Sequence, residues 1–211
     1  MLALGFVGGY VFGLCGAKDE LMRATRRLIA ISEQHQLSHF RAIGQNKLGW
    51  ALCQSGDFRQ GISVLEPAIQ ALEGAEFRLA LPFDLAILAD AKRRVGDLDG
   101  ATAVCARALR MIADTGQRWI EPEALRIEAL TVHDLHPREP ERAEAILRRA
   151  AGSARSLALP VFELRCLSSL QNVLRKSDRD VDGRLKELSS LGDLEMRAAK
   201  AAQSVASLLS G

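Results

Sequence analysis

A short turn motif occurs twice in this sequence, 40 residues apart, and each copy separates two apolar, helix-like segments. The motif is Gly56-Asp57-Phe58 in the first copy and Gly96-Asp97-Leu98 in the second. A fixed period of this length is typical of repeat arrays, in which each unit is one supersecondary element that buries its apolar face against its neighbours. The periodicity therefore predicts a stack of similar helical units with contacts between adjacent units.

The segment after each turn carries the same spacing of small and large apolar residues, with the third copy shifted by a longer loop. Spacings of four and three place these residues on one stripe of a helix, where small side chains allow a second helix to approach closely. The preceding helices supply small residues at matching positions, Gly49, Ala89 and Ala129. The stripes consist of Gly61, Leu65 and Ala68, then Ala101, Cys105 and Ala108, and then Ala143, Leu147 and Ala150.

Composition agrees with an all-helical chain. Hydrophobic residues make up 48% of the sequence and aromatic residues only 5%, which favours helices over sheets. We expect an all-α fold, a right-handed superhelix of antiparallel helix pairs with about 9–11 helices. Repeats are expected over 1–176 and capping helices over 177–211. From the periodicity we expect helices at about 2–14, 18–36, 39–55, 58–73, 78–95, 98–114, 120–135, 140–157 and 160–176.

These residues resemble the tetratricopeptide repeat (TPR) family. Its signature has Leu-Gly in the first helix of each pair and small, large and Ala positions in the second. The positions that match best are Leu48, Gly49, Gly61, Leu65 and Ala68. The aromatic positions of the family are mostly Leu or Cys here, and the period of 40 to 42 exceeds the family's usual value of about 34. The resemblance implies a TPR-like α-solenoid with degenerate, long-helixed units.

A second resemblance covers Thr115–Glu123, the pair Arg126-Ile127 and the helix Arg142–Leu147. These segments look like the C-terminal TPR-like region of bacterial multidomain regulators. Those regulators join an adenylate or guanylate cyclase, or a DNA-binding domain, to an ATPase module, as in the LuxR-like proteins. The resemblance implies a role in bacterial signalling or transcription regulation. Neither a cyclase domain nor a GxxxxGK[ST] nucleotide-binding loop is present in the sequence.

The net charge bears on the class of binding partner, and the cysteines bear on the redox environment. The net charge of +2 gives no general attraction for nucleic acid or an anionic membrane, and we expect no nucleic-acid partner. Cys15, Cys53, Cys105 and Cys166 lie far apart without metal-ligand spacing, so we interpret them as apolar packing residues in a reducing, cytoplasmic environment. No motif indicates a cofactor, a metal site or a catalytic set.

The first 17 residues support an alternative interpretation. They carry no charge and contain Gly5, Gly9 and Gly13 at four-residue spacing, as a membrane helix with a GxxxG face would. The run stops at Lys18, which is short for a span, and no Lys or Arg precedes it. We expect a buried first helix, and a membrane-attached adaptor anchored by residues 1–17 is the alternative.

The function expected from these features is a non-catalytic interaction or sensor module that binds a peptide, protein or small ligand on its concave face. A partner protein, including a cyclase- or ATPase-type regulator, is expected, and self-association is left open. An enzyme whose site is assembled only in the fold is the other alternative. Residues of the first helices should line the groove, with partly exposed Trp50 and Arg126 as anchors. The groove candidates are Asn46, Trp50, Asp90, Arg94, Glu123, Arg126, Arg165 and Ser168.

Overall fold

The computed structural model describes residue 5 and residues 9–14 and 16–176, and these residues form nine α-helices, one short 3₁₀ helix and no strand. The prediction of an all-α chain is therefore confirmed for the described residues. In chain order the elements are α1 (Gly9–Leu14), α2 (Lys18–Gln34), α3 (Ser38–Gln54), α4 (Phe58–Gly74), α5 (Leu81–Arg94), α6 (Leu98–Thr115), η2 (Arg118–Ile120), α7 (Glu121–Leu135), α8 (Pro140–Ser156) and α9 (Pro160–Lys176).

From residue 18 onward, each helix expected from the periodicity is present with closely matching ends. The largest difference is at α5, which begins at Leu81 rather than at residue 78. Ala80 adopts a left-handed conformation (φ 59°) and Pro82 lies in the first turn, so the helix starts after Ala80. The helix expected over 2–14 is described only as α1, and the capping helices expected over 177–211 lie outside the described residues.

The Gly-Asp pair of each turn motif ends one helix and caps the start of the next. Gly56 has φ +91°, and the amides of Gly56 and Asp57 donate to the carbonyls of Cys53 and Leu52, which closes the end of α3. The carboxylate of Asp57 then accepts a hydrogen bond from the amide of Gln60 at 3.3 Å in the first turn of α4. Asp97 caps α6 in the same way through the amide of Gly100, at 2.9 Å. The aspartate of each copy thus caps the helix that follows, and glycine is favoured before it because its φ is positive.

The left-handed turn conformation recurs at positions that are not glycine as well as at glycines. Six residues with positive φ are spaced 20 residues apart, and two of these six are not glycine; Ala80 and Ala158 also have positive φ but lie outside this series. A second amide bond of the same type closes the non-glycine turns, for example from Leu37 to the carbonyl of Ser32. The structural repeat of the helices is therefore 20 residues, half of the hairpin period. The positions are Gly16, Gln36, Gly56, Glu76, Gly96 and Gly116.

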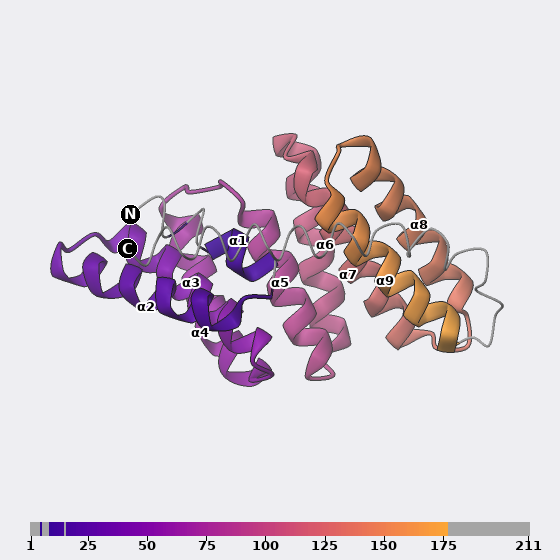
Figure 1. The fold of residues 1–211 in the computed structure, drawn as a ribbon, viewed down its shortest axis with the longest axis horizontal. Helices are drawn as coiled ribbons and strands as arrows, with labels where there is room; N and C mark the ends of the chain where they lie inside the picture. Colours follow the sequence, from indigo (N-terminus) through magenta and orange to yellow (C-terminus); the bar gives the residue numbers. More distant parts are fainter. Residues whose placement is uncertain (1–4, 6–8, 15, 177–211) are drawn as a thin grey trace.

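Neighbouring helices pack in sequence order along the long axis of the molecule (Figure 1). Each helix contacts the next one in the chain. In addition, the odd-numbered helices contact one another in series, from α1 to α3, α5, α7 and α9. The odd helices therefore form a continuous layer, and they carry all the residues expected to bind a ligand.

Small residues bring the paired helices together as predicted. A methyl group on Gly61 would lie 2.3 Å from Sγ of Cys53, and one on Gly49 would lie 2.6 Å from Cγ of Leu65. Each methyl group would also lie 3.0 Å from the carbonyl oxygen of the opposite glycine, so backbone meets backbone between α3 and α4. The equivalent positions of the later units are fully buried, namely Ala101, Ala108, Ala143 and Ala150.

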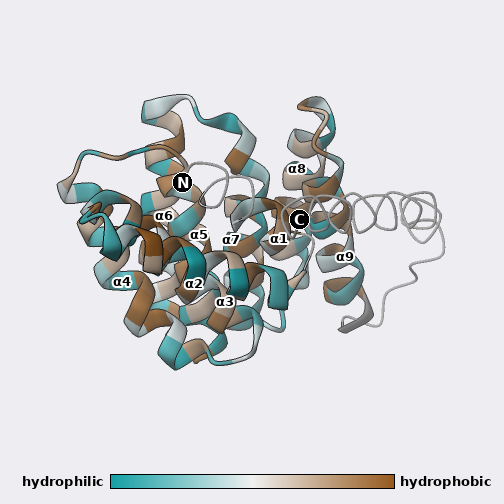
Figure 2. Ribbon diagram, turned by 60° about the vertical axis from the view of Figure 1, so that its left-hand side comes forward, coloured by the Kyte–Doolittle hydropathy of each residue, from teal (hydrophilic) through white to brown (hydrophobic). Residues whose placement is uncertain are grey.

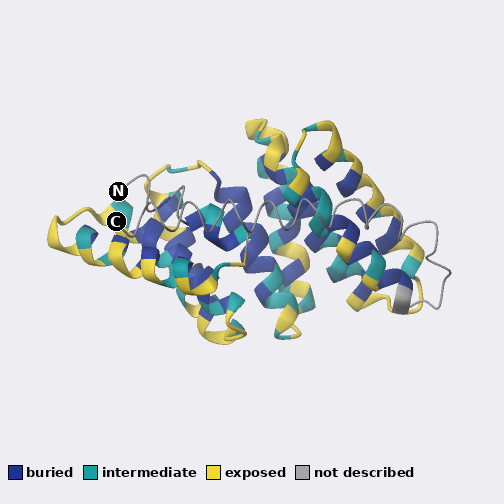
Figure 3. Ribbon diagram, in the orientation of Figure 1, coloured by how far each residue is buried: buried dark blue, intermediate teal, exposed yellow. Residues whose placement is uncertain are grey.

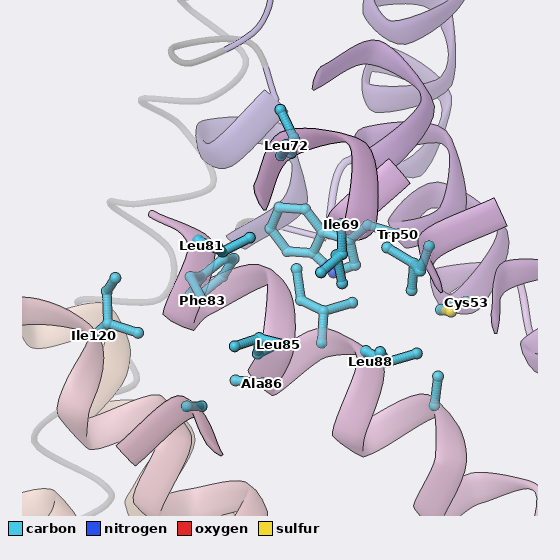
Figure 4. Close-up of a cluster of buried hydrophobic side chains, with 14 of the residues drawn as sticks. Trp50, Cys53, Ile69, Leu72, Leu81, Phe83, Leu85, Ala86, Leu88 and Ile120 are labelled. Carbon is cyan, nitrogen blue, oxygen red and sulfur yellow. The ribbon is translucent and has the colours of Figure 1, made fainter. Parts of the chain in front are cut away.

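Hydrophobic and hydrophilic residues alternate along the helices (Figure 2). Buried residues lie mainly where helices face one another, and exposed residues lie on turns and on the outer faces of the helices (Figure 3). A large cluster lies between α3, α4 and α5, where Trp50, Cys53, Ile69, Leu85 and Leu88 gather (Figure 4). Fully burying one such aliphatic side chain stabilises the fold by roughly 1.5–3 kcal/mol. The same cluster of buried residues extends from Phe12 in α1 to Phe162 in α9, so the core runs along the array.

Aromatic contacts extend beyond adjacent units, which corrects the expectation that only neighbouring units touch. The ring of Phe83 in α5 lies 6.2 Å from that of Phe162 in α9, and the ring of Tyr10 in α1 lies 6.4 Å from that of Trp119 in η2. Phe83 also stacks on Trp119 at 6.2 Å. The starts of α1, α5 and α9 and the 3₁₀ helix before α7 thus converge on one aromatic cluster.

The glycines of the N-terminal segment pack against α3. Methyl groups added to Gly5, Gly9 and Gly13 would meet Ile43, Lys47 and Trp50, in that order. The four-residue spacing thus serves contact between two helices of this chain. Within the described residues, no helix combines the length and apolar character needed to cross a membrane.

The close contact at Gly61 predicts opposite effects for two Gly→Ala substitutions. Gly61→Ala should lower the free energy of unfolding by about 1–3 kcal/mol, because the added methyl group collides with Cys53 and the backbone of α3. Gly152→Ala is the control, since nothing lies within 4 Å of its added methyl group, and it should raise stability by about 0.5–1 kcal/mol through helix propensity. Urea denaturation measures both values. An increase in stability for Gly61→Ala would contradict the packing described.

The repeated left-handed turn predicts a second matched pair. Gln36→Gly should raise the free energy of unfolding by about 1 kcal/mol, because Gln36 holds φ 56° and glycine adopts that conformation without strain. Gln70→Gly, in the exposed interior of α4, should lower it by about 1 kcal/mol. Thermal or urea unfolding distinguishes the two, and equal destabilisation by both would rule out a strained turn at Gln36.

Candidate functional site

The odd helices line a cavity of about 300 Å³, and five of the eight predicted groove residues border it. Those five come from four helices that lie far apart in the sequence. They are Trp50 of α3, Asp90 and Arg94 of α5, Glu123 of α7 and Arg165 of α9. The three other candidates, Asn46, Arg126 and Ser168, are not among its lining residues.

The cavity is lined by both apolar and charged side chains. Phe83, Ile87 and Ile127 contribute aromatic and aliphatic surface beside Trp50, and the first residue of α4, Phe58, adds another ring. Acidic and basic side chains both border the cavity. Ligand sites commonly combine such an apolar surface with a few polar groups that set orientation.

Glu123 is the centre of the most buried charge network at this site. Its two carboxylate oxygens accept hydrogen bonds from Arg126, at 2.9 and 2.7 Å, and from Arg165, at 3.1 and 2.8 Å. Arg126 also donates to the hydroxyl of Ser169 at 3.2 Å. Burial alone would raise the pKa of Glu123, but the two guanidinium groups hold that pKa far below its usual range. The network therefore keeps Glu123 ionised and ties α7 to α9.

Two predicted anchors are more buried than expected. The exposed fraction is 6% for Trp50 and 8% for Arg126, whereas both residues were expected to be partly exposed. Arg126 lies behind Glu123 as its partner, and Trp50 packs in the α3/α4/α5 core. Trp50 thus borders the cavity from the core side, and Arg126 acts by positioning Glu123.

The serine that takes part in the Glu123 network is Ser169, one position after the predicted Ser168. Ser168 is exposed, and its neighbour Ser169 is the buried residue that binds Arg126. One residue along an α-helix corresponds to a rotation of about 100°, so an error of one position changes the face. Ser169 could have been found only by knowing the rotation of α9 relative to α7.

The other acidic residue that borders the cavity, Asp90, forms a close ion pair with Arg93 and a longer one with Arg94. Its carboxylate accepts from Nε and a terminal nitrogen of Arg93 at 3.0 and 2.7 Å, and Arg93 also donates to Asp134 at 2.6 Å. Arg94 is half exposed and approaches Asp90 only to 3.7 Å. Because Asp90 is already engaged by Arg93, Arg94 is the cation beside the cavity that is most available to a ligand.

A second buried polar group, which the sequence analysis did not identify, lies beneath α1. Nζ of Lys47 donates to Asp84 at 2.7 Å and to the amide oxygen of Asn46 at 3.0 Å, and the ring of Tyr10 lies 3.8 Å from Nζ. Burial lowers the pKa of Lys47 and raises that of Asp84, so burial opposes both charges and each depends on the other. Asn46, a groove candidate, is part of this group instead of the cavity.

The three described cysteines are packing residues, as predicted from their spacing. Cys53, Cys105 and Cys166 are buried and form no disulfide among the described residues. Burial raises the pKa of each of these thiols to about 12, which keeps them protonated and poorly nucleophilic. Cys15 lies outside the described residues.

Comparison with known proteins adds no assignment, because no protein-family model matches the chain and no curated protein matches it either. The resemblances to TPR proteins and to bacterial regulators therefore stay predictions.

The Glu123 network predicts a specific dependence of stability on pH. At neutral pH, Glu123→Gln should lower the free energy of unfolding by about 3 kcal/mol, because Arg126 stays buried without a charged partner. As the pH falls below the ordinary value of 4.5, the unfolded state takes up a proton at Glu123 that the folded state does not bind. Protonation thus favours unfolding, and the variant should lose stability less steeply in acid than the parent protein.

Glu139→Gln is the control for this experiment. Glu139 pairs with Arg142 at 3.2 Å on the surface, so its replacement should change stability by less than about 1 kcal/mol. Urea denaturation between neutral and acidic pH provides the measurement. If Glu123→Gln and Glu139→Gln gave the same pH profile, the buried network would not contribute as described.

Proposed function

We propose that this chain is a non-catalytic interaction or sensor module, built as a TPR-like right-handed superhelix of helix pairs, that binds a peptide, protein or small ligand. The ligand occupies the inner surface formed by the odd helices. The serial contacts between α3, α5, α7 and α9 support this architecture, since stacked hairpins present their first helices on one face.

The observation that carries the proposal is the convergence of predicted residues on one cavity. Trp50, Arg94 and Arg165 come from three helices spread over more than half the chain, yet they border the same space of about 300 Å³. Tryptophan and arginine are the residues most enriched among binding hot spots. A lining that combines apolar and charged side chains suits a ligand with an apolar part and polar groups.

The state of the polar groups favours binding over catalysis. Glu123 is held ionised by two arginines, which makes it a weak base, and the cysteine beside the cavity, Cys53, has its pKa raised to about 12. A general base or nucleophile needs a pKa near the working pH, and neither group has one.

The biological setting follows from the resemblance alone. We place the module in cytoplasmic signalling or transcription regulation, with a protein partner such as a cyclase- or ATPase-type regulator. Its likeness to the repeat region of those regulators, centred on Thr115–Glu123, is the basis for this placement.

A peptide selection tests the binding site. Peptides selected from a random library against the full chain should bind saturably, and Arg94→Glu should weaken them by roughly tenfold or more, because it reverses the most available charge beside the cavity. Arg59→Glu is the matched control, since Arg59 is an exposed arginine of α4 outside the cavity. Isothermal titration calorimetry gives the affinities, and equal binding by both variants would remove the cavity as the site.

A further inference from the structure

A second exposed feature lies outside the cavity, where the loop before α5 meets the loop before α7. Four large apolar side chains of the described region are exposed by more than a third, and two of them, Leu79 (55%) and Trp119 (36%), belong to these loops. Leu79 follows the exposed Arg78, and Trp119 follows the exposed Arg118. We call these four residues, Arg78, Leu79, Arg118 and Trp119, the loop patch.

The two loops are joined by one side chain. The side-chain amide of Gln117 donates to the carbonyl of Arg78 at 3.1 Å, and its oxygen accepts from the amide of Ala80 at 3.2 Å. Both bonds hold the backbone on either side of Leu79. The spacing of Leu79 and Trp119 is therefore set in the free protein, which reduces the entropy that a partner would have to overcome.

Trp119 is held in place from beneath. Its ring stacks on Phe83 at 6.2 Å and lies edge-on to Tyr10 at 6.4 Å, while the following residue, Ile120, is fully buried. A tryptophan that packs on neighbouring rings and is also partly exposed is an ordered anchor, and such residues often dominate binding energy.

The remaining residues of the Thr115–Glu123 segment have structural roles. Gly116 ends α6 with φ +69°, and Glu121 accepts from the hydroxyl of Ser153 at 3.1 Å. Gln117 joins the loops and Glu123 holds its two arginines. Arg118 and Trp119 are the large side chains of this motif that are exposed, although Trp119 also packs on the aromatic rings beneath it.

The charge of the loop patch indicates the chemistry of its partner. Arg118 is largely exposed, and its contact with Glu121 is long, at 3.5 Å. Arg78 forms no ion pair with any residue that the structure describes. Two available guanidinium groups beside two apolar side chains attract carboxylates that flank an apolar residue.

We propose that the loop patch is an interaction surface, separate from the cavity, that binds an acidic peptide segment carrying apolar anchor residues. The apolar anchors of that segment pack on Trp119 and Leu79, and its carboxylates pair with Arg78 and Arg118.

Three fluorescein-labelled synthetic peptides of equal length test this proposal against the full chain. The first alternates Glu and Leu, the second has Lys in place of each Glu, and the third has Ser in place of each Leu. Fluorescence anisotropy should give saturable binding for the first peptide alone, weakened by added salt. Failure of the first peptide to bind, or equal binding of the second, would overturn the proposal.

Matched variants locate the contact. Arg118→Glu and Leu79→Ser should each weaken the first peptide by about tenfold or more, and neither side chain is needed for the core. Arg138→Glu and Leu135→Ser are controls, because they change an exposed arginine and an exposed leucine elsewhere. Equal binding by all four variants would overturn the assignment.

Two further measurements separate this surface from the cavity. Arg94→Glu should leave the first peptide unaffected, so loss of binding in that variant but not in Arg118→Glu would assign the peptide to the cavity and overturn the proposal. The chain has two tryptophans, so Trp50→Phe leaves Trp119 as the single reporter. Its emission should shift to shorter wavelength when the peptide binds, and an unchanged spectrum would contradict contact with Trp119.

Discussion

The close approach of paired helices at small residues is the constraint on which the rest of this structure depends. Gly49 and Gly61 allow the backbones of α3 and α4 to meet, and the alanines of the later pairs occupy equivalent buried positions. Close packing within each pair leaves the odd helices free to contact one another in series. A larger residue at Gly49 or Gly61 would separate α3 from α4 and displace the side chains of α3 that border the cavity.

The buried charges add a second constraint, which concerns specificity more than stability. A buried ion pair recovers its desolvation cost only with good geometry and additional hydrogen bonds, and removal of one partner is strongly destabilising. Glu123 meets these conditions through Arg126 and Arg165, and Lys47 meets them through Asp84 and Asn46. Each group fixes one odd helix against the next. We infer that these pairs set the relative rotation of the odd helices and so the shape of the cavity.

Much of the helix pattern could be predicted from the sequence because its signals are local. The Gly-Asp turns mark helix ends through φ and capping, and the small-residue stripes mark contact faces. The turns at Gln36 and Glu76 have the same geometry, but no glycine reveals them. A search for a 20-residue period of helix ends, independent of residue type, would have found both.

The candidate site was predictable only in part, because its details depend on the rotation of each helix about its axis and on the curvature of the helix array. Five residues predicted on the first helices of the pairs border one cavity, but periodicity does not determine how each helix is rotated about its axis. Ser168 and Asn46 point elsewhere, and Lys47 and Asp84 were overlooked because charged residues in a helix are usually solvated. The contact between Phe83 and Phe162 arises from curvature over several units, which no periodicity encodes.

The most direct test of the account is the distance between the α-protons of Gly49 and Gly61 in solution. Nuclear Overhauser spectroscopy on protein labelled at glycine should give a cross-peak between these two residues, because each glycine faces the carbonyl oxygen of the other across α3 and α4. A folded, helical protein without that cross-peak would contradict the close approach of the paired helices, and with it the arrangement of the odd helices around the cavity.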